Sequence, residues 1–172
     1  MDCNKLRTFV LLFLMFFAVS GCFRYSFTGT SIPENVNSIY IPFFADQSNS
    51  GVSNLSDILN QALIERFINQ SRLTLANSRG NADAVLEGSI RRYTNQAFSL
   101  SGNQQTSRNE VEISVQATYK YTDKEQAEWS SSFNGSATYD TNEDPIEGET
   151  DAAREALSQV ADNMFNDAVS GW

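Results

Sequence analysis

A strict alternation of apolar and polar residues runs along Val111–Tyr121 and constrains the fold more than any other feature. The apolar set is Val111, Ile113, Val115, Ala117, Tyr119 and Tyr121, and the residues between them are Glu112, Ser114, Gln116, Thr118 and Lys120. Successive side chains of a β-strand point to opposite faces, so the pattern predicts a sheet with one covered face and one wet face. Glu128–Tyr139 repeats the alternation after the short segment Thr122–Ala127, which predicts a hairpin with a wet face of Ser, Thr, Asn and Gln.

Two amphipathic helices and three further strand segments accompany this hairpin. Apolar residues recur at three- and four-residue spacing over 54–69 and over 150–170, which predicts a helix with one apolar face in each range. Asn54 is expected to cap the first helix. The other strand segments are 38–44, 72–75 and 84–93, with a polar loop over 45–53 and a long hairpin connection or strand extension over 94–109.

These elements predict an α+β fold: a two-layer sandwich in βαβββα order, with two helices on one face of a mostly antiparallel sheet. Many small alanines on the last helix favour close packing of that helix against the sheet. The aromatic residues Tyr119, Tyr121, Trp129 and Phe133 are interpreted as core rather than as a binding platform.

The first residues have the pattern of an export signal. Lys5 and Arg7 precede the apolar run Phe9–Val19, which is too short to span a bilayer. Residues 19–22 then read Val-Ser-Gly-Cys, which is typical of a bacterial lipobox, whose cysteine takes a diacylglycerol before the chain is cut and acylated. Cys22 is therefore the expected lipid-attachment site. An ordinary signal peptide with a chance cysteine is the alternative.

Cleavage at this point would divide the chain into three parts. They are a signal peptide over 1–21, a lipidated tether over 22–37 and a single domain over 38–172. Because Cys3 would leave with the signal and Cys22 would be lipidated, we expect no disulfide in the mature domain.

The composition excludes several function classes. The net charge is −9, and residues 1–21 carry one net positive charge, so residues 22–172 carry −10. Such an acidic chain is a poor candidate for binding nucleic acid. Histidine is absent, and with it the commonest general base and zinc ligand. The sequence has no phosphate-binding loop, nucleophile elbow or metal-ligand spacing, so we expect neither an enzyme nor a cofactor or metal site.

Two charged features have a functional and a structural interpretation. The acidic run 140–144 resembles the start of a calcium loop, but Pro145 occupies its sixth position, so an acidic linker ahead of a helix is preferred.

Because adjacent strand residues point to opposite faces, only one of Arg91 and Arg92 is expected on the wet face. Arg91 is assigned there, either as a contact for a phosphate or carboxylate or as an ordinary paired surface residue.

A series of segments spans the rest of the chain in a characteristic order. They are Tyr25–Pro33 (YSFTGTSIP), Ile39–Phe43 (IYIPF), the Leu55–Phe67 helix, Arg72–Leu75 (RLTL), Ala82-Asp83, Leu86–Ile90 (LEGSI) and the amphipathic helix that ends near Trp172. Together they resemble the LptE family of lipopolysaccharide-assembly lipoproteins, whose small α/β sandwich agrees with the predicted fold.

The resemblance implies an outer-membrane lipoprotein that faces the periplasm and partners the large β-barrel translocon LptD as a plug and assembly aid. It also implies contact with lipopolysaccharide, for which Arg91, Arg108 and Lys120 are the candidate cations. Two other classes remain open. A module of a secretion ring or envelope scaffold would self-associate through strand edges, and a carrier of a small lipid would need an apolar cavity between helices and sheet.

Overall fold

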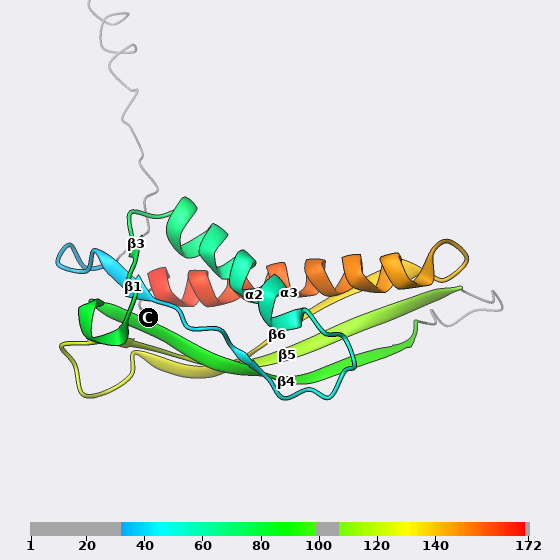
Figure 1. Ribbon diagram of the computed structural model, residues 1–172, viewed down its shortest axis with the longest axis horizontal. Coiled ribbons are helices and arrows are strands. Elements are labelled where there is room, and N and C mark those ends of the chain that lie inside the picture. The colour runs from blue at the N-terminus through cyan, green and yellow to red at the C-terminus, as the bar shows by residue number, and fades with distance from the viewer. Residues whose placement is uncertain (1–31, 99–106, 171–172) are drawn as a thin grey trace, which may run out of the picture.

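The computed structural model describes residues 32–98 and 107–170, which form a two-layer sandwich (Figure 1). One layer is a sheet, and the other consists of two helices that lie on the same side of it. The expected signal peptide, Cys22 and most of the expected tether lie outside the described residues. The predicted α+β class and two-layer architecture are confirmed.

The sheet contains six strands and is mostly antiparallel, as predicted. Three long antiparallel strands form its body, and three short strands run parallel to their neighbours on one side. The order across the sheet is β3-β1-β4-β5-β6, and β2 pairs with β4 beyond the end of β1. The bounds are β1 Ser38–Tyr40, β2 Ala45–Asp46, β3 Thr74–Leu75, β4 Ala84–Ala97, β5 Arg108–Tyr121 and β6 Trp129–Asp140.

The helical layer consists of α2 (Leu55–Ile64), which continues as the π-helical turn η1 (Glu65–Asn69), and α3 (Pro145–Ser170). A short 3₁₀ turn, η2 (Arg79–Asn81), precedes β4. α3 runs along the long strands, and α2 packs beside it over the half of the sheet that contains β1 (Figure 1).

The start of α3 and the expected cap of α2 differ from the prediction. The Oδ1 atom of Asp144 accepts the backbone N–H groups of Ile146 (3.0 Å) and Glu147 (3.1 Å). With Pro145 at the first helical position, this cap starts α3 five residues before the predicted residue 150. The prediction for Asn54 is wrong, because its side chain makes no capping hydrogen bond to α2.

The predicted covered face of β5 is the centre of the core. All six of its apolar residues are buried, from Val111 at 0% exposure to Tyr121 at 6%. They belong to one core cluster with the buried face of α3, which includes Ala153, Ala156, Leu157, Val160, Ala161, Met164 and Ala168. The aromatic residues interpreted as core are buried or partly buried, and Tyr119 stacks on Trp129 at 5.8 Å between ring centroids.

Three details of the sheet correct or complete the sequence interpretation. The predicted order βαβββα contains four strands, whereas the structure has six. One strand is lacking because the predicted order left out one of the five predicted strand segments. The other is β2, which is too short to show periodicity. β4 runs to Ala97, so the start of the 94–109 segment is a strand extension, one of the two alternatives that the sequence left open. The pairing of β4 with β5 also shifts between Ile90 and Arg92, which leaves Arg91 as the extra residue of a β-bulge.

The end of the expected tether is part of the packed domain. Ile32 is 9% exposed and Val36 is 2% exposed, and both belong to the core cluster. The Arg72 guanidinium donates hydrogen bonds to the backbone carbonyls of Ile32 (3.0 Å) and Pro33 (2.5 Å). The chain is therefore fixed to the domain from Ile32 onward.

Asp83 joins the start of β4 to the start of β1. Its Oδ2 atom accepts the backbone N–H groups of Asn37 and Ser38, both at 2.9 Å, and the Ser38 hydroxyl at 2.8 Å. These donors favour the ionised carboxylate, and the Asn37 N–H makes the largest contribution to lowering the pKa of Asp83.

We expect Asp83→Asn to lower the midpoint of thermal unfolding by a few degrees at pH 7. Because the folded pKa is lowered, the carboxylate contributes its stability above the unfolded pKa of about 3.9 and loses it as the pH falls through the folded pKa. The gap between the two proteins should therefore close in acid when melting is followed by circular dichroism. Asp123→Asn, a change at an exposed position, is the control. A gap that stays constant down to the lowest pH would contradict the role of the carboxylate.

Candidate functional site

The face of the sheet opposite the helices is a ladder of small polar side chains. Direct register pairs across β5 and β6 are Ser114↔Asn134, Gln116↔Ser132 and Thr118↔Ser130. The Ser132 hydroxyl donates to Gln116 Oε1 at 2.9 Å, and the Thr118 and Ser130 hydroxyls lie 2.9 Å apart. We call this surface, formed by the polar side of β4, β5 and β6, the open face. It presents hydroxyl and amide groups over its middle and carboxylates, Glu110 and Glu112, towards one end.

The bulge in β4 changes the placement of the paired arginines. Arg92 lies directly opposite Ser114 and therefore shares the open face. Arg91 is exposed as well, and its Nη1 atom donates to Gln47 Oε1 at 2.6 Å. The sequence placed Arg91 rather than Arg92 on the wet face. That prediction is wrong for Arg92, because a bulge sets two residues of one strand against one residue of the next and so shifts the alternation. Arg92 is thus a cation of this face that the sequence analysis missed.

The three candidate cations do not converge on one site. Arg108 begins β5, and Lys120 is one residue from its end. At roughly 3.3 Å per residue the two positions lie about 40 Å apart along the strand. Arg91 lies beside the middle of β5, near the pair Ile90↔Val115. A single anionic group can therefore contact one of these residues, but not all three.

A hydrogen-bond cluster holds together the end of the sandwich that α2 does not reach. The Tyr93 hydroxyl donates to Glu149 Oε1 of α3 at 2.6 Å. The pKa of Tyr93 is raised, mainly because the hydroxyl is buried and secondly because this carboxylate disfavours the ionised form. The Asn95 amide donates to the Tyr139 hydroxyl at 2.8 Å, and the Asn109 amide donates to Asn95 Oδ1 at 3.1 Å. The ends of β4, β5, β6 and α3 are fixed by polar contacts here rather than by apolar packing alone.

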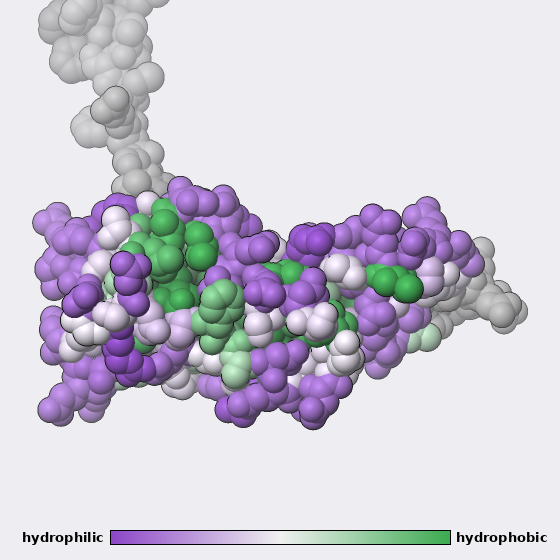
Figure 2. All heavy atoms as spheres, viewed as in Figure 1, coloured by the Kyte–Doolittle hydropathy of each residue, from purple (hydrophilic) through white to green (hydrophobic). Residues whose placement is uncertain are grey.

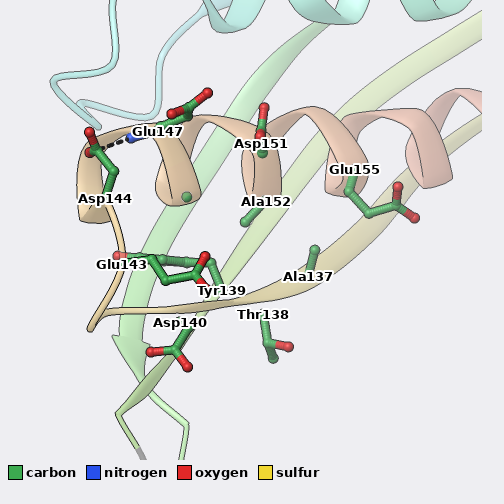
Figure 3. A pocket seen from close by; sticks show the side chains of 11 residues that line it. Ala137, Thr138, Tyr139, Asp140, Glu143, Asp144, Glu147, Asp151, Ala152 and Glu155 are labelled. Carbon is green, nitrogen blue, oxygen red and sulfur yellow. Dashed lines mark hydrogen bonds between the residues drawn. The ribbon is translucent and has the colours of Figure 1, made fainter.

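A groove of about 530 Å³ lies between β6 and the first half of α3 (Figure 3). The floor of the groove is made of small or flat side chains. Ala137 of β6 and Ala152 of α3 both point into the space between these two elements. Carboxylates surround this floor. They come from β6, the connecting loop and α3: Asp140, Glu143, Asp144, Glu147, Asp151 and Glu155. We call this feature the acidic groove.

The surface as a whole is hydrophilic on the side shown in Figure 2, where hydrophobic residues gather mainly over the end of the sandwich at which η1 meets the end of α3. In that region the rings of Phe67 and Phe165 meet edge to face at 5.3 Å. No helix in the described parts of the chain is long and apolar enough to cross a membrane. Over the same residues, no group of three or more metal-ligating side chains is placed to hold an ion.

A family model with the description lipopolysaccharide-assembly, that of LptE, matches residues 36–168. The chain belongs to the LptE family. This match confirms the resemblance that was based on the order of short segments along the chain. The matched region extends from just before β1 almost to the end of α3. No curated protein sequence matches the chain.

Solved structures with little sequence identity share the fold of this LptE-family chain. A putative lipoprotein from Caulobacter crescentus CB15 is 17% identical, with a TM-score of 0.51, and the match covers 77% of this chain and 88% of that one. A minor lipoprotein from Acinetobacter baumannii is 14% identical, with a TM-score of 0.53, over 80% and 93% of the two chains. Protein XCC0632 from Xanthomonas campestris is 13% identical, with a TM-score of 0.57, over 79% and 85%.

Proposed function

We propose that this LptE-family chain is an outer-membrane lipoprotein, anchored through Cys22 on the periplasmic side, that acts as plug and assembly partner of an LptD-type β-barrel. The family match over residues 36–168 carries the proposal, because the family is one of lipopolysaccharide assembly. The names of two structural neighbours, a putative lipoprotein and a minor lipoprotein, support a lipid anchor.

The open face supports a place inside a polar barrel. Barrel interiors are polar, and a charge buried there without a partner is costly. The middle of the open face presents hydroxyls and amides that can exchange water for partner hydrogen bonds, as in the pair Gln116 and Ser132. A plug that contacts a barrel wall through the middle of β5 and β6 therefore buries mainly hydroxyls and amides, with Arg92 as the charged neighbour on β4.

A pull-down of the tagged full chain from detergent-solubilised outer membrane tests the partnership. We expect one large β-barrel protein in near-equal amount, identified by mass spectrometry. Recovery of the chain with only itself, or with inner-membrane secretion components, would contradict the proposal and favour the ring or scaffold class.

Cys22→Ala tests the anchor. We expect the variant to leave the membrane fraction almost completely, since two or more acyl chains at about 0.8 kcal/mol per buried methylene account for stable attachment. The circular dichroism spectrum and melting temperature of the domain should stay unchanged, because Cys22 lies ahead of Ile32, where the described part of the chain begins. Cys3→Ala, a change at the other cysteine of the chain, is the matched control and should remain in the membrane. Membrane retention of Cys22→Ala would contradict the lipobox.

A further inference from the structure

The two edges of the sheet are protected to very different degrees. On one side the outermost strands are β3 and β2, which are two residues long, and Pro42 interrupts the chain between β1 and β2. Short strands and prolines are the usual means by which proteins prevent another strand from pairing at an edge. On the other side lies β6, which is 12 residues long. From Trp129 to Tyr139 it contains no proline, lysine or other charged residue.

Every second residue of β6 directs its backbone N–H away from the sheet. The Thr141 N–H donates to the Ser107 carbonyl, so the odd-numbered residues face β5. The Ser136 N–H points outward, where Gln159 Oε1 of α3 accepts it at 3.2 Å. Thr138 is two residues further on and has the same direction. Among the described residues β6 pairs with β5 alone, so this edge can accept a further strand.

The acidic groove borders the part of this edge that contains Thr138. The groove is lined by β6 from Ala137 to Asp140, and no lysine or arginine lines it. Two of its carboxylate residues have a cationic neighbour: Arg154 forms an ion pair with Asp151, and Arg108 is opposite Asp140 in the register. A second hollow continues the acidic border along β6 with Glu110 and Glu112.

The shape and charge of the groove select the chemistry of the occupant. A floor of alanine methyl groups and the Tyr139 ring suits an aliphatic stem, and the surrounding carboxylates suit a cationic head, as in a lysine or arginine side chain (Figure 3). An anionic lipid is repelled here. Pairing of β6 with the β6 of a second copy would bring two acidic borders together, which is also unfavourable.

We propose that the β6 edge is a docking site for an extended, lysine- or arginine-rich segment of a partner protein, which adds a strand beside β6 and places a basic side chain in the acidic groove. Strand addition supplies affinity through backbone hydrogen bonds, and the groove supplies selectivity for the side chain. The inference does not require the partner to be a barrel, so it stands or falls separately from the proposed function.

The test uses the full chain in detergent micelles and a fluorescein-labelled peptide of alternating lysine and threonine, matched in length to β6. Hydrogen exchange is measured at the individual amides of β6. We expect the peptide to slow exchange at least about tenfold at Thr138 and Asp140, whose N–H groups point outward, but to leave the odd-numbered amides unchanged. Simple electrostatic attachment of a basic peptide to an acidic protein would not produce this alternation.

Four variants and one peptide separate the components of the site. Thr138→Pro removes an outward N–H without removing a hydrogen bond to β5 and should weaken binding at least about tenfold, whereas Thr138→Ala should bind normally.

The double change Glu143→Gln and Glu147→Gln should also weaken binding, and it spares the Asp144 cap. Its matched control, Asp57→Asn with Glu125→Gln, removes two charges at exposed positions elsewhere. A peptide with acetylated lysines should bind poorly.

Each contrary outcome overturns the inference. Equal binding by Thr138→Pro, or uniform protection of odd and even amides, excludes strand addition. Equal binding of the acetylated peptide, or an equal loss in the control double variant, excludes the groove as the basic-side-chain site. Outward amides that become protected with rising protein concentration in the absence of peptide would identify a second copy of this chain as the occupant.

Discussion

Val115→Asp is expected to abolish the native fold. Val115 is fully buried at the centre of β5, opposite Ile90 on one side and Phe133 on the other. An aspartate there places a carboxylate among apolar side chains with no partner, which lowers the free energy of unfolding by at least about 4 kcal/mol. Domains of this size are stable by about 5–15 kcal/mol, so most of the stability is lost. Chemical denaturation followed by circular dichroism measures the change.

The neighbouring position provides the control. Ser114→Asp puts the same carboxylate on the open face, directly opposite Arg92. This variant should keep its stability within about 1 kcal/mol, because a cross-strand pair of opposite charges is neutral or favourable. Similar unfolding midpoints for Val115→Asp and the native protein would refute the assignment of the covered face.

Gly135→Ala is expected to be nearly as damaging, although it adds a single methyl group. Gly135 lies in β6 where α3 crosses it, and a Cβ there would overlap the backbone carbonyl oxygen of Ala156 and lie 2.9 Å from its carbonyl carbon. Those atoms belong to the helix backbone, so α3 as a whole would have to shift from the sheet. We expect a loss of about 3 kcal/mol in the free energy of unfolding, typical of severe overpacking.

The same change at Gly80 provides the comparison. Gly80 lies in η2, and a Cβ there would meet no atom within 4 Å. Gly80→Ala should be neutral or slightly stabilising, because alanine restricts the unfolded chain more than glycine does. If the two variants unfold at the same denaturant concentration, α3 does not approach β6 as closely as the structure shows.

This close approach also bears on the carrier hypothesis. Alanines dominate the face of α3 that packs on β5 and β6, and Ala153, Ala156 and Ala161 are fully buried there. The backbone of α3 at Ala156 lies directly against Gly135, so helix and sheet leave no room between them for a lipid cargo at this crossing.

The elements that the sequence predicted best are those with a repeated pattern. The alternation over Val111–Tyr121 predicted both faces of β5, since each side chain of a strand has one of two directions. Three- and four-residue spacing likewise predicted the buried sides of α2 and α3. β2 and β3 are two residues long and have too little pattern of their own, so their pairing depends on the neighbouring strands.

The candidate surface was predicted only in part. A polar face on β5 and β6 follows directly from their alternation. The exposure of both Arg91 and Arg92 does not, because a bulge arises from the fit between two strands rather than from either strand alone. The acidic groove was also missed. Its carboxylates come from β6, the connecting loop and α3, and the sequence indicated only an acidic linker at that point.

The sequence alone determined the class of the protein: an α+β sandwich of the LptE family, with one apolar and one polar side to each long strand. The spacing of apolar residues along a strand or helix depends only on residues close together in the sequence. It can therefore be recognised without knowing which element packs against them. Tertiary structure alone decided which strand became the open edge, where β4 bulges and how closely α3 approaches Gly135. Those features depend on the relative positions of segments far apart in the chain, and only packing of the whole domain fixes them.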